Sequence, residues 1–213
     1  MLDSLINEKP LKVALVLSIV TIVYNIVEGI ISVIFGLNDQ ALALLGFGID
    51  SFVEVISGIG ILHLIVRIKN SSAESRDKFE STALRITGFG FYILTAGLVA
   101  GSIINIIEKN NPSTTIAGII VSVISIITMY LLMKAKLKVG EKLNSDAIIA
   151  DAHCTRTCFN LSIILLLSSL LYEISSIGYF DILGSLGIAY YSFMEGKESF
   201  EKAENNKLSC TCS

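Results

Sequence analysis

Charged residues are scarce in this chain. Only 16% of its 213 residues are Asp, Glu, Lys or Arg, and 53% are hydrophobic, whereas soluble domains average about 25% charged residues. That balance excludes a disordered chain, and the long apolar runs are unlike a disulfide-stabilised secreted module. A net charge of −3 argues against nucleic-acid binding, which usually requires a basic surface. The composition instead predicts an all-α, polytopic membrane protein.

Six segments are apolar and long enough to cross a bilayer, which takes about 20 helical residues. Proline is also scarce, and Pro10 and Pro112 both lie at span edges, where they kink no helix. The first segment is too long for a cleaved signal peptide. We expect one transmembrane domain over residues 1–200 and a short cytoplasmic tail over residues 201–213. The predicted spans are Val13–Phe35, Ala41–Val66, Ile86–Ile107, Ile116–Met133, Ile148–Tyr172 and Ile177–Met194.

Lysine and arginine are confined almost entirely to alternate connections between the spans. Of the 16 basic residues, all but Lys109 and Arg156 lie before span one, between spans two and three, between spans four and five, or after span six. Basic residues favour the cytoplasmic side of a membrane. We therefore expect six transmembrane helices with both termini in the cytoplasm. The other three connections are short and predict antiparallel helix pairs.

Ionisable residues inside the spans are few, and they are grouped. Asp50 and Glu54 are four residues apart in span two and share one helix face. Asp151, Cys154 and Cys158 share one face of span five. Such residues mark a site or a pathway, because each costs at least about 2.5–3.5 kcal/mol at the bilayer centre. Counting about 1.5 Å per residue from the span ends places both pairs near the midplane, with Glu54 level with Cys154 and Asp50 level with Cys158.

Two carboxylates and two thiols at one depth suit a tetrahedral metal ion. Zn²⁺ binds such mixed donor sets, and the sulfurs also admit the softer Cd²⁺, whereas Mn²⁺ and Mg²⁺ prefer octahedra of oxygen. Each pair alone has a simpler interpretation. Two cysteines on an apolar helix usually pack as small residues, and paired carboxylates can be satisfied by polar neighbours. The agreement in depth favours a shared metal site.

Two motifs resemble those of a known family. Residues 41–57, ALALLGFGIDSFVEVIS, are similar to the second-helix signature of the cation diffusion facilitator family. Residues 144–162, NSDAIIADAHCTRTCFNLS, are similar to its fifth-helix signature, and residues 181–189, DILGSLGIA, match its sixth helix less strictly. The resemblance is closest to a short branch that lacks the cytoplasmic carboxyl-terminal domain and carries cysteines in the fifth helix.

The resemblance implies export of divalent metal ions, in exchange for protons, by a homodimer. It places Asp50 and Glu54 at the first pair of metal ligands, and Cys154 and Cys158 at the second. Thiols at the second pair leave the identity of the metal open, with Zn²⁺ expected first and Cd²⁺ next. The residues themselves support exchange, because four ionised ligands would leave a net charge of −2 around a divalent ion at the midplane. The site without metal must therefore be largely protonated, and an arriving ion must displace those protons.

Two other functions are compatible with the same residues. A non-transporting membrane modulator could bind zinc at this site. An intramembrane thiol oxidoreductase could use Cys154 and Cys158, although such enzymes usually place a Cys-x-x-Cys pair near the membrane surface. We expect no enzymatic activity and no cofactor besides the transported ion.

Other polar residues of span five have open roles. Asp151 is expected to lie outside the metal's direct ligands, as a supporting carboxylate or part of the ion pathway. His153 points away from Cys154 and is expected to pack or to form hydrogen bonds. Arg156 lies on the face opposite Cys154, where it either pairs with Glu28 of span one or extends to the lipid surface.

The remaining candidates lie near the span ends. His63 is expected at the cytoplasmic interface, and the connection over residues 68–81 has no histidine, which argues against a histidine-rich loop site. Asp181 near the outer end of span six could cap a helix, gate the pathway or face water. Cys210 and Cys212 in the tail are interpreted as idle thiols rather than a handle for acquiring metal.

Overall fold

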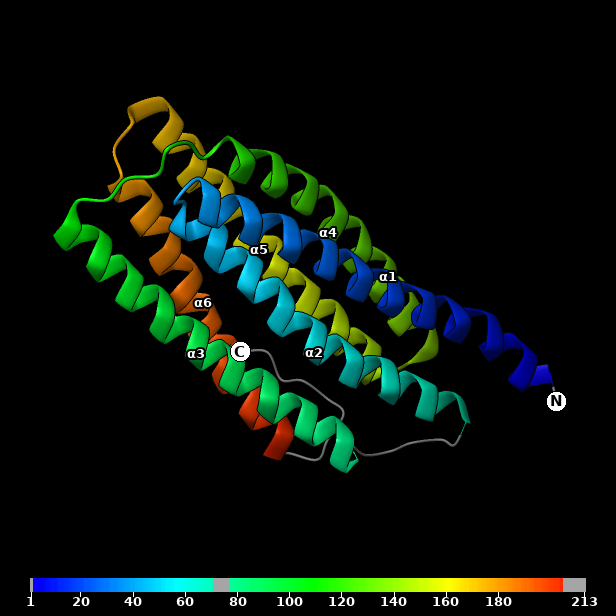
Figure 1. The fold of residues 1–213 in the computed structure, drawn as a ribbon. Helices are drawn as coiled ribbons and strands as arrows, with labels where there is room; N and C mark the ends of the chain where they lie inside the picture. The colour runs from blue at the N-terminus through cyan, green and yellow to red at the C-terminus, as the bar shows by residue number, and fades with distance from the viewer. Residues whose placement is uncertain (1, 71–76, 205–213) are drawn as a thin grey trace.

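The computed structural model describes residues 2–70 and 77–204 of the chain. That part is all-helical, as the composition predicts, and contains no strand. Figure 1 shows the helices side by side in one elongated bundle. They are α1 (Leu2–Asn38), α2 (Leu42–Asn70), α3 (Lys78–Glu108), α4 (Ile116–Leu143), α5 (Asp146–Ser175) and α6 (Tyr179–Glu204).

Successive helices run in opposite directions, so the connections gather at two ends of the bundle (Figure 1). The end that holds the start of α1, the α2–α3 and α4–α5 connections and the carboxyl end of α6 is here named the basic end. The opposite end holds the other three connections. Four reversals each place one non-glycine residue in the left-handed region, with φ between 48° and 57°, which ends a helix tightly. These residues are Gln40, Lys109, Asn144 and Ser176.

Five of the helices are long and apolar enough to cross a membrane, namely α1 to α5. The sixth predicted span corresponds to α6, whose carboxyl-terminal half is rich in charge. α6 nevertheless packs extensively along α3 in the same bundle, so it crosses the layer that α3 crosses. Six helices in one bundle confirm the predicted polytopic architecture.

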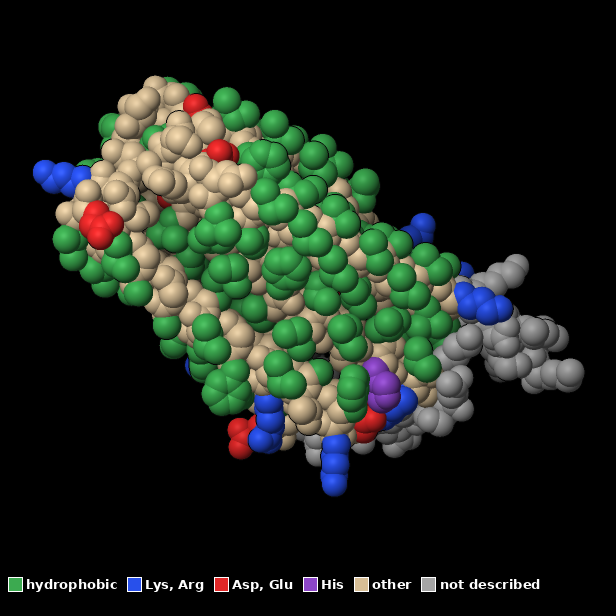
Figure 2. Space-filling view, in the orientation of Figure 1, with side chains coloured by type: hydrophobic (Ala, Val, Ile, Leu, Met, Phe, Trp, Pro, Cys, Tyr) green, Lys and Arg blue, Asp and Glu red, His purple; other side chains and the backbone are tan. Residues whose placement is uncertain are grey.

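Apolar side chains cover the outside of the bundle between its two ends. Figure 2 shows them as a broad hydrophobic surface, with the charged side chains gathered toward the ends. On α1 alone, Val16, Val23 and Ile34 are each more than half exposed. A surface of this extent would be unusual on a soluble monomer and suits contact with lipid tails.

The helices pack in three main pairs, α1 with α2, α3 with α6 and α4 with α5. α2 also contacts α5 and α6, which confirms the prediction that spans two and five are neighbours. Close packing of α1 on α2 depends on small residues. A Cβ atom built at Gly48 would lie 2.8 Å from the backbone nitrogen of Val33, so only glycine fits there.

Two carboxylates join helices at the opposite end, the buried Asp181 and the partly exposed Glu173. Asp181 of α6 accepts hydrogen bonds from the backbone nitrogens of Leu42 and Ala43, at 2.9 and 3.2 Å. Glu173 of α5 accepts one from the backbone nitrogen of Thr115, at 2.5 Å. Backbone N–H groups at a helix start have no partner within the helix, and a carboxylate satisfies them. Of the three roles considered for Asp181, the structure therefore shows the first, capping of α2.

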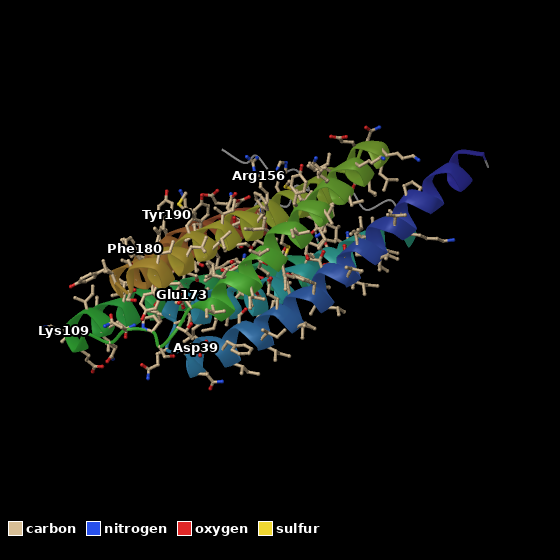
Figure 3. All side chains as sticks on the ribbon, turned by 90° about the horizontal axis from the view of Figure 1, so that it is seen from above. Asp39, Lys109, Arg156, Glu173, Phe180 and Tyr190 are labelled. Atoms are coloured by element: carbon tan, nitrogen blue, oxygen red, sulfur yellow. The ribbon has the colours of Figure 1, made fainter. Side chains whose placement is uncertain are left out.

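The structure corrects the predicted end of span four and decides between the two roles left open for Arg156. α4 continues to Leu143, ten residues past the predicted span, so Lys136 lies inside the helix and not in a connection. The alternative ion pair between Arg156 and Glu28 is not formed. Glu28 is buried and accepts a hydrogen bond from Tyr24 at 2.8 Å, whereas Arg156 is exposed and points away from the bundle (Figure 3). Of the two alternatives, the outward-pointing side chain agrees with extension away from the bundle.

Candidate metal centre

A cavity of about 50 Å³ lies inside the bundle, between α1, α2, α4, α5 and α6, with α3 contributing apolar residues to its wall. A single water molecule needs about 10–15 Å³ of such space, so the cavity has room for an ion with part of its hydration shell. The wall is unusually polar for a membrane-embedded site. Its polar and ionisable residues are Thr21, Asn25, Glu54, Ser57, Lys136, Asp151, Cys154, Thr155, Cys158, Glu195, Ser199 and Lys202.

Glu54 and Cys158 form the centre of this wall. The Cys158 thiol donates to the Glu54 carboxylate, with its sulfur 2.7 Å from Oε1 and 2.6 Å from Oε2. The Asn25 amide nitrogen donates to Oε2 at 3.1 Å. Three helices thus converge on one carboxylate: α1, α2 and α5.

The predicted register of α2 against α5 is wrong by one turn. Cys158, which was expected level with Asp50, contacts Glu54. The prediction counted each depth from the start of its own span and took the two starts to be separated by a hydrocarbon core of about 30 Å. Counted through the Glu54–Cys158 contact, the start of α2 at Leu42 and the start of α5 at Asp146 are 24 residues apart along the bundle, or about 36 Å. The helices extend beyond the assumed core by about one turn, which is the size of the error.

Asp50 lies one turn from Glu54, and its surroundings differ. It is 2% exposed and is not part of the cavity wall. The Ser192 hydroxyl of α6 donates to its Oδ1 at 3.0 Å. Three of the four predicted ligands therefore line the cavity, and Asp50 occupies the adjacent layer toward the opposite end.

Cys154 lines the same cavity, one turn closer to the basic end than Cys158. The Lys202 ammonium of α6 donates to its sulfur at 3.7 Å and forms an ion pair with Glu198 at 2.7 Å. No disulfide joins Cys154 to Cys158. Both thiols are thus placed to supply sulfur ligands from one face of α5.

Asp151 is held by a buried cation and not by the thiols. The Lys136 ammonium lies 3.0 Å from Asp151 Oδ2 and donates to the Thr155 hydroxyl at 3.0 Å. Lys136 is 1% exposed and Asp151 is 7% exposed. This pair joins α4 to α5 at the part of the cavity nearest the basic end.

Several polar residues of the site were missed from the sequence. Glu195 of α6 lines the cavity and accepts a hydrogen bond from the Thr157 hydroxyl at 2.8 Å. α1 carries a polar face of which only Glu28 was considered from the sequence, although its spacing of three and four residues is that of one helix side. The face consists of Ser18, Thr21, Asn25, Glu28 and Ser32.

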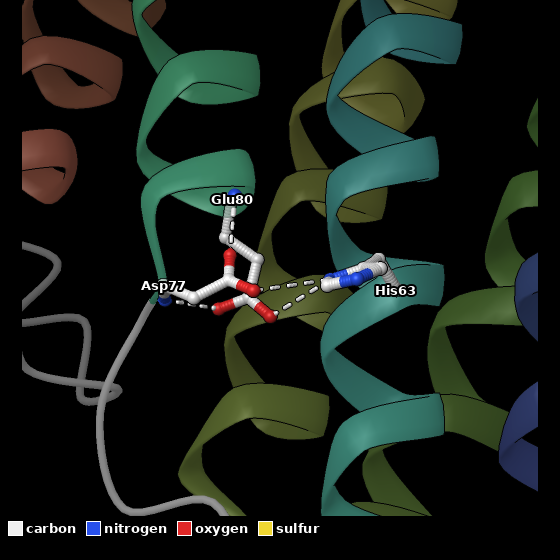
Figure 4. A group of neighbouring side chains, drawn as sticks. All are labelled: His63, Asp77 and Glu80. Atoms are coloured by element: carbon white, nitrogen blue, oxygen red, sulfur yellow. Dashed lines mark hydrogen bonds and ion pairs between the residues drawn. The ribbon is translucent and has the colours of Figure 1, made fainter.

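A second group of potential ligands lies at the basic end, where α2 meets α3 (Figure 4). One ligand atom each of His63, Asp77 and Glu80 lies within 4.8 Å of the others. The loop beyond α2 has no histidine, but His63 reaches the two carboxylates from inside α2. Such a group could hold a divalent ion.

The same carboxylates already have protein partners. Arg67 forms ion pairs with Asp77 at 3.0 Å and with Glu80 at 3.4 Å, and Asp77 and Glu80 cap the start of α3 reciprocally. The hydrogen bond from the Glu80 backbone, together with Arg67, lowers the pKa of Asp77 against a smaller opposing effect of burial. The group therefore joins α2 to α3 without any ion, and a metal would have to compete with Arg67.

Sequence comparison places these features in a family. The model of the cation efflux transmembrane domain matches residues 14–203, which include all three helices that meet at Glu54. The chain belongs to the cation efflux family. This family match and the five helices that are long and apolar enough to cross a membrane show that the chain is an integral, multi-pass membrane protein.

One curated relative is similar over most of the chain. It is an uncharacterized transporter of Methanocaldococcus jannaschii, 28% identical over 186 residues, which are 85% of this chain and 63% of the relative. The chain thus spans less than two thirds of that relative's length. The family match over residues 14–203 contains all the residues that line the cavity described above.

Proposed function

We propose that this transporter exports Zn²⁺, and also accepts Cd²⁺, in exchange for protons. The ion binds in the cavity to Glu54, Cys154 and Cys158, with Asp50 in the adjacent layer as a further carboxylate on the path. The observation that carries the proposal is the direct contact between the Cys158 thiol and the Glu54 carboxylate in a buried, ion-sized cavity. A carboxylate with two sulfurs is a donor set suited to Zn²⁺ and Cd²⁺.

The same contact supports exchange with protons. A sulfur and a carboxylate oxygen at this distance share a proton, because two ionised groups would repel each other. A thiol binds metal only after it has lost its proton. Zn²⁺ must therefore displace at least the proton between Glu54 and Cys158, and protons arriving from the other side of the membrane displace the ion. Occupancy by metal and by protons then favours opposite states of the transporter.

The charge pattern orients the proposed path. The basic end is assigned to the cytoplasm by its lysines and arginines. For export, which the family resemblance implies, the ion enters past Lys136 and Lys202 and leaves past Asp50. A homodimer that depends on packing between transmembrane helices remains our expectation from family resemblance.

Zn²⁺ uptake by protein-containing liposomes tests the exchange. With Zn²⁺ outside and a zinc-sensitive dye inside, we expect an acidic interior to accelerate uptake several-fold, and a proton ionophore to abolish that acceleration. Liposomes without protein provide the baseline. Uptake at one rate with and without the gradient would contradict proton exchange. Zn²⁺ binding without any flux would instead favour the non-transporting modulator.

The thiols should set the choice between Zn²⁺ and Cd²⁺. Replacing Cys154 with His and Cys158 with Asp exchanges soft sulfur donors for harder ones, so we expect the preference for Cd²⁺ over Zn²⁺ to fall by about tenfold or more. Competition between the two ions for uptake measures this ratio. The matched control replaces Cys210 and Cys212 of the tail, which lie outside the described residues, with serine. An unchanged ratio in the first variant would show that the sulfurs do not bind the ion.

A further inference from the structure

The polar face of α1 holds every unpaired buried side-chain nitrogen or oxygen found in the part of the chain that the structure describes. These atoms are the side-chain oxygens of Ser18, Asn25 and Ser32. The three residues follow one another at intervals of seven, about two helical turns, and each is at most 3% exposed. Buried polar atoms are almost always paired, and an unpaired one calls for an explanation such as water or an ion. Three in one line indicate a feature that continues along the helix.

The line extends across much of the membrane. From Ser18 to Ser32 is a distance of about 21 Å at 1.5 Å per residue, in a hydrocarbon core about 30 Å thick. Ser18 lies toward the basic end and Ser32 toward the opposite end, because α1 starts at the basic end (Figure 1). Between them the same face carries Thr21, which lines the cavity, and Glu28. The face therefore leads from the opposite end to the cavity.

Glu28 is the ionisable member of this face, and its contacts indicate that it holds a proton. The Ser51 hydroxyl lies 3.0 Å from the carbonyl oxygen of Phe47 and 3.3 Å from Glu28 Oε2. A hydroxyl has one proton to donate, and serines in helices commonly donate it to the carbonyl one turn earlier. The glutamate then supplies the proton of the other bond. Glu28 is also 5% exposed and forms no ion pair with the described residues, and a buried charge without a partner is strongly disfavoured.

The surroundings of Glu28 connect it to the metal site. The Tyr24 hydroxyl donates to Glu28 Oε1 at 2.8 Å, and the Tyr24 side chain packs against the cluster that contains Cys158. The α4 helix contributes the hydroxyl of Ser125. The titratable groups that face Glu28 are Tyr24 of α1, Asp50 and Glu54 of α2 and Cys158 of α5. A proton that leaves Glu28 thus has acceptors close by in the metal site.

Glu28 and the path of the metal ion lie on different sides of α2. Asp50 and Ser51 are adjacent in the sequence and so point about 100° apart. Asp50 accepts a hydrogen bond from Ser192 of α6, whereas Ser51 contacts Glu28 of α1. Glu28 is not part of the cavity wall. Hydroxyl and carboxyl groups in single file can pass a proton, but they do not provide the several ligands that a zinc ion requires at once.

We propose that Glu28 relays protons between the opposite end and the metal site, along the polar face of α1 and apart from the path of the metal ion. This inference rests on the proton exchange under the proposed function. As the ion leaves, the Glu28 carboxyl group gives its proton to the Glu54 carboxylate and becomes a carboxylate itself. A proton from the opposite end then restores it. Water bound to the unpaired oxygens of Asn25 and Ser32 bridges the gaps.

Zn²⁺ uptake by liposomes that contain Glu28→Gln tests the relay. Glutamine keeps the shape of the side chain and can still form hydrogen bonds with Tyr24 and Ser51, but it cannot release a proton. We expect most of the acceleration by an acidic interior to be lost. Exchange of labelled for unlabelled Zn²⁺ at equal pH on both sides needs no net proton movement, so it should continue at the wild-type rate.

Glu28→Asp separates the relay from a purely structural role. Aspartate is one methylene shorter but can hold and release a proton, so a relay predicts that it retains the response to the pH gradient better than Glu28→Gln does. A structural role predicts the reverse order, because glutamine matches the native shape more closely. Glu108→Gln is the matched control, because it makes the same chemical change at an exposed position of α3 at the opposite end. It should respond to the gradient as the wild type does.

Proton movement measured with a pH-sensitive dye inside the liposomes distinguishes the possible failures. Wild-type protein that moves Zn²⁺ without moving protons would overturn the proposed exchange itself. Proton movement that persists unchanged in Glu28→Gln would overturn the relay and leave the exchange intact. Loss of labelled Zn²⁺ exchange in Glu28→Gln, or better function in this variant than in Glu28→Asp, would also overturn the relay, in favour of a structural role.

Discussion

Replacing Glu54 with glutamine should abolish Zn²⁺ transport. Glutamine has nearly the same shape but cannot ionise, so it supplies no negative charge to the ion and no proton to exchange. Glu54 is the residue on which α1, α2 and α5 converge, through Asn25 and Cys158. Removing a direct ligand should cost more than the tenfold to hundredfold loss that is typical of a supporting residue. We expect affinity to fall by more than about a hundredfold and the response to a pH gradient to disappear.

The liposome uptake assay checks this result, together with direct Zn²⁺ binding. Glu141→Gln is the matched control, because this substitution makes the same chemical change at an exposed position of α4 near the basic end. That variant should transport Zn²⁺ as the wild type does. Uptake by Glu54→Gln that still accelerates with an acidic interior would place proton coupling on another group, with Asp50 and Glu195 as the nearest carboxylates to examine.

Much of the architecture could be predicted because a bilayer leaves the backbone few options. Every backbone N–H and C=O group in lipid must be satisfied within a helix, so long apolar runs specify helices. The same setting makes each ionisable residue conspicuous. Glu54, Cys154 and Cys158 could be selected for that reason, and the structure brings all three to one cavity.

The features that were missed depend on contacts between helices. The register of α2 against α5 is set by packing along their whole length and not by where each apolar run begins. Lys136 follows an apolar run and carries a charge, so by sequence it belongs to a loop. Its burial becomes apparent only when Asp151 of the neighbouring helix is seen 3.0 Å away. Asn25 is neutral and lies in an apolar stretch, so the sequence around it gives no indication that the oxygen of its side chain is unpaired.

Breaking the pair between Lys136 and Asp151 should destabilise the bundle strongly. Lys136→Met keeps the length and the apolar stem of the side chain, but it leaves the Asp151 carboxylate buried without its cation. Removing one partner of a buried ion pair typically costs about 3–5 kcal/mol. The Thr155 hydroxyl also loses the donor that the Lys136 ammonium provides. We expect the free energy of unfolding, measured by denaturant in detergent micelles, to fall by about that amount.

The double variant Lys136→Met with Asp151→Asn distinguishes the loss of a charge partner from the loss of packing. An asparagine is neutral, so the buried charge left by Lys136→Met is removed, and most of the lost stability should return. Lys138→Met controls for the substitution itself, because Lys138 is exposed on the same helix, and it should shift stability by less than about 0.5 kcal/mol. A double variant as unstable as Lys136→Met would mean that the lysine stabilises α4 against α5 by packing alone. Recovery would mean that Lys136 stabilises the bundle as the charge partner of the buried Asp151 carboxylate and not by packing.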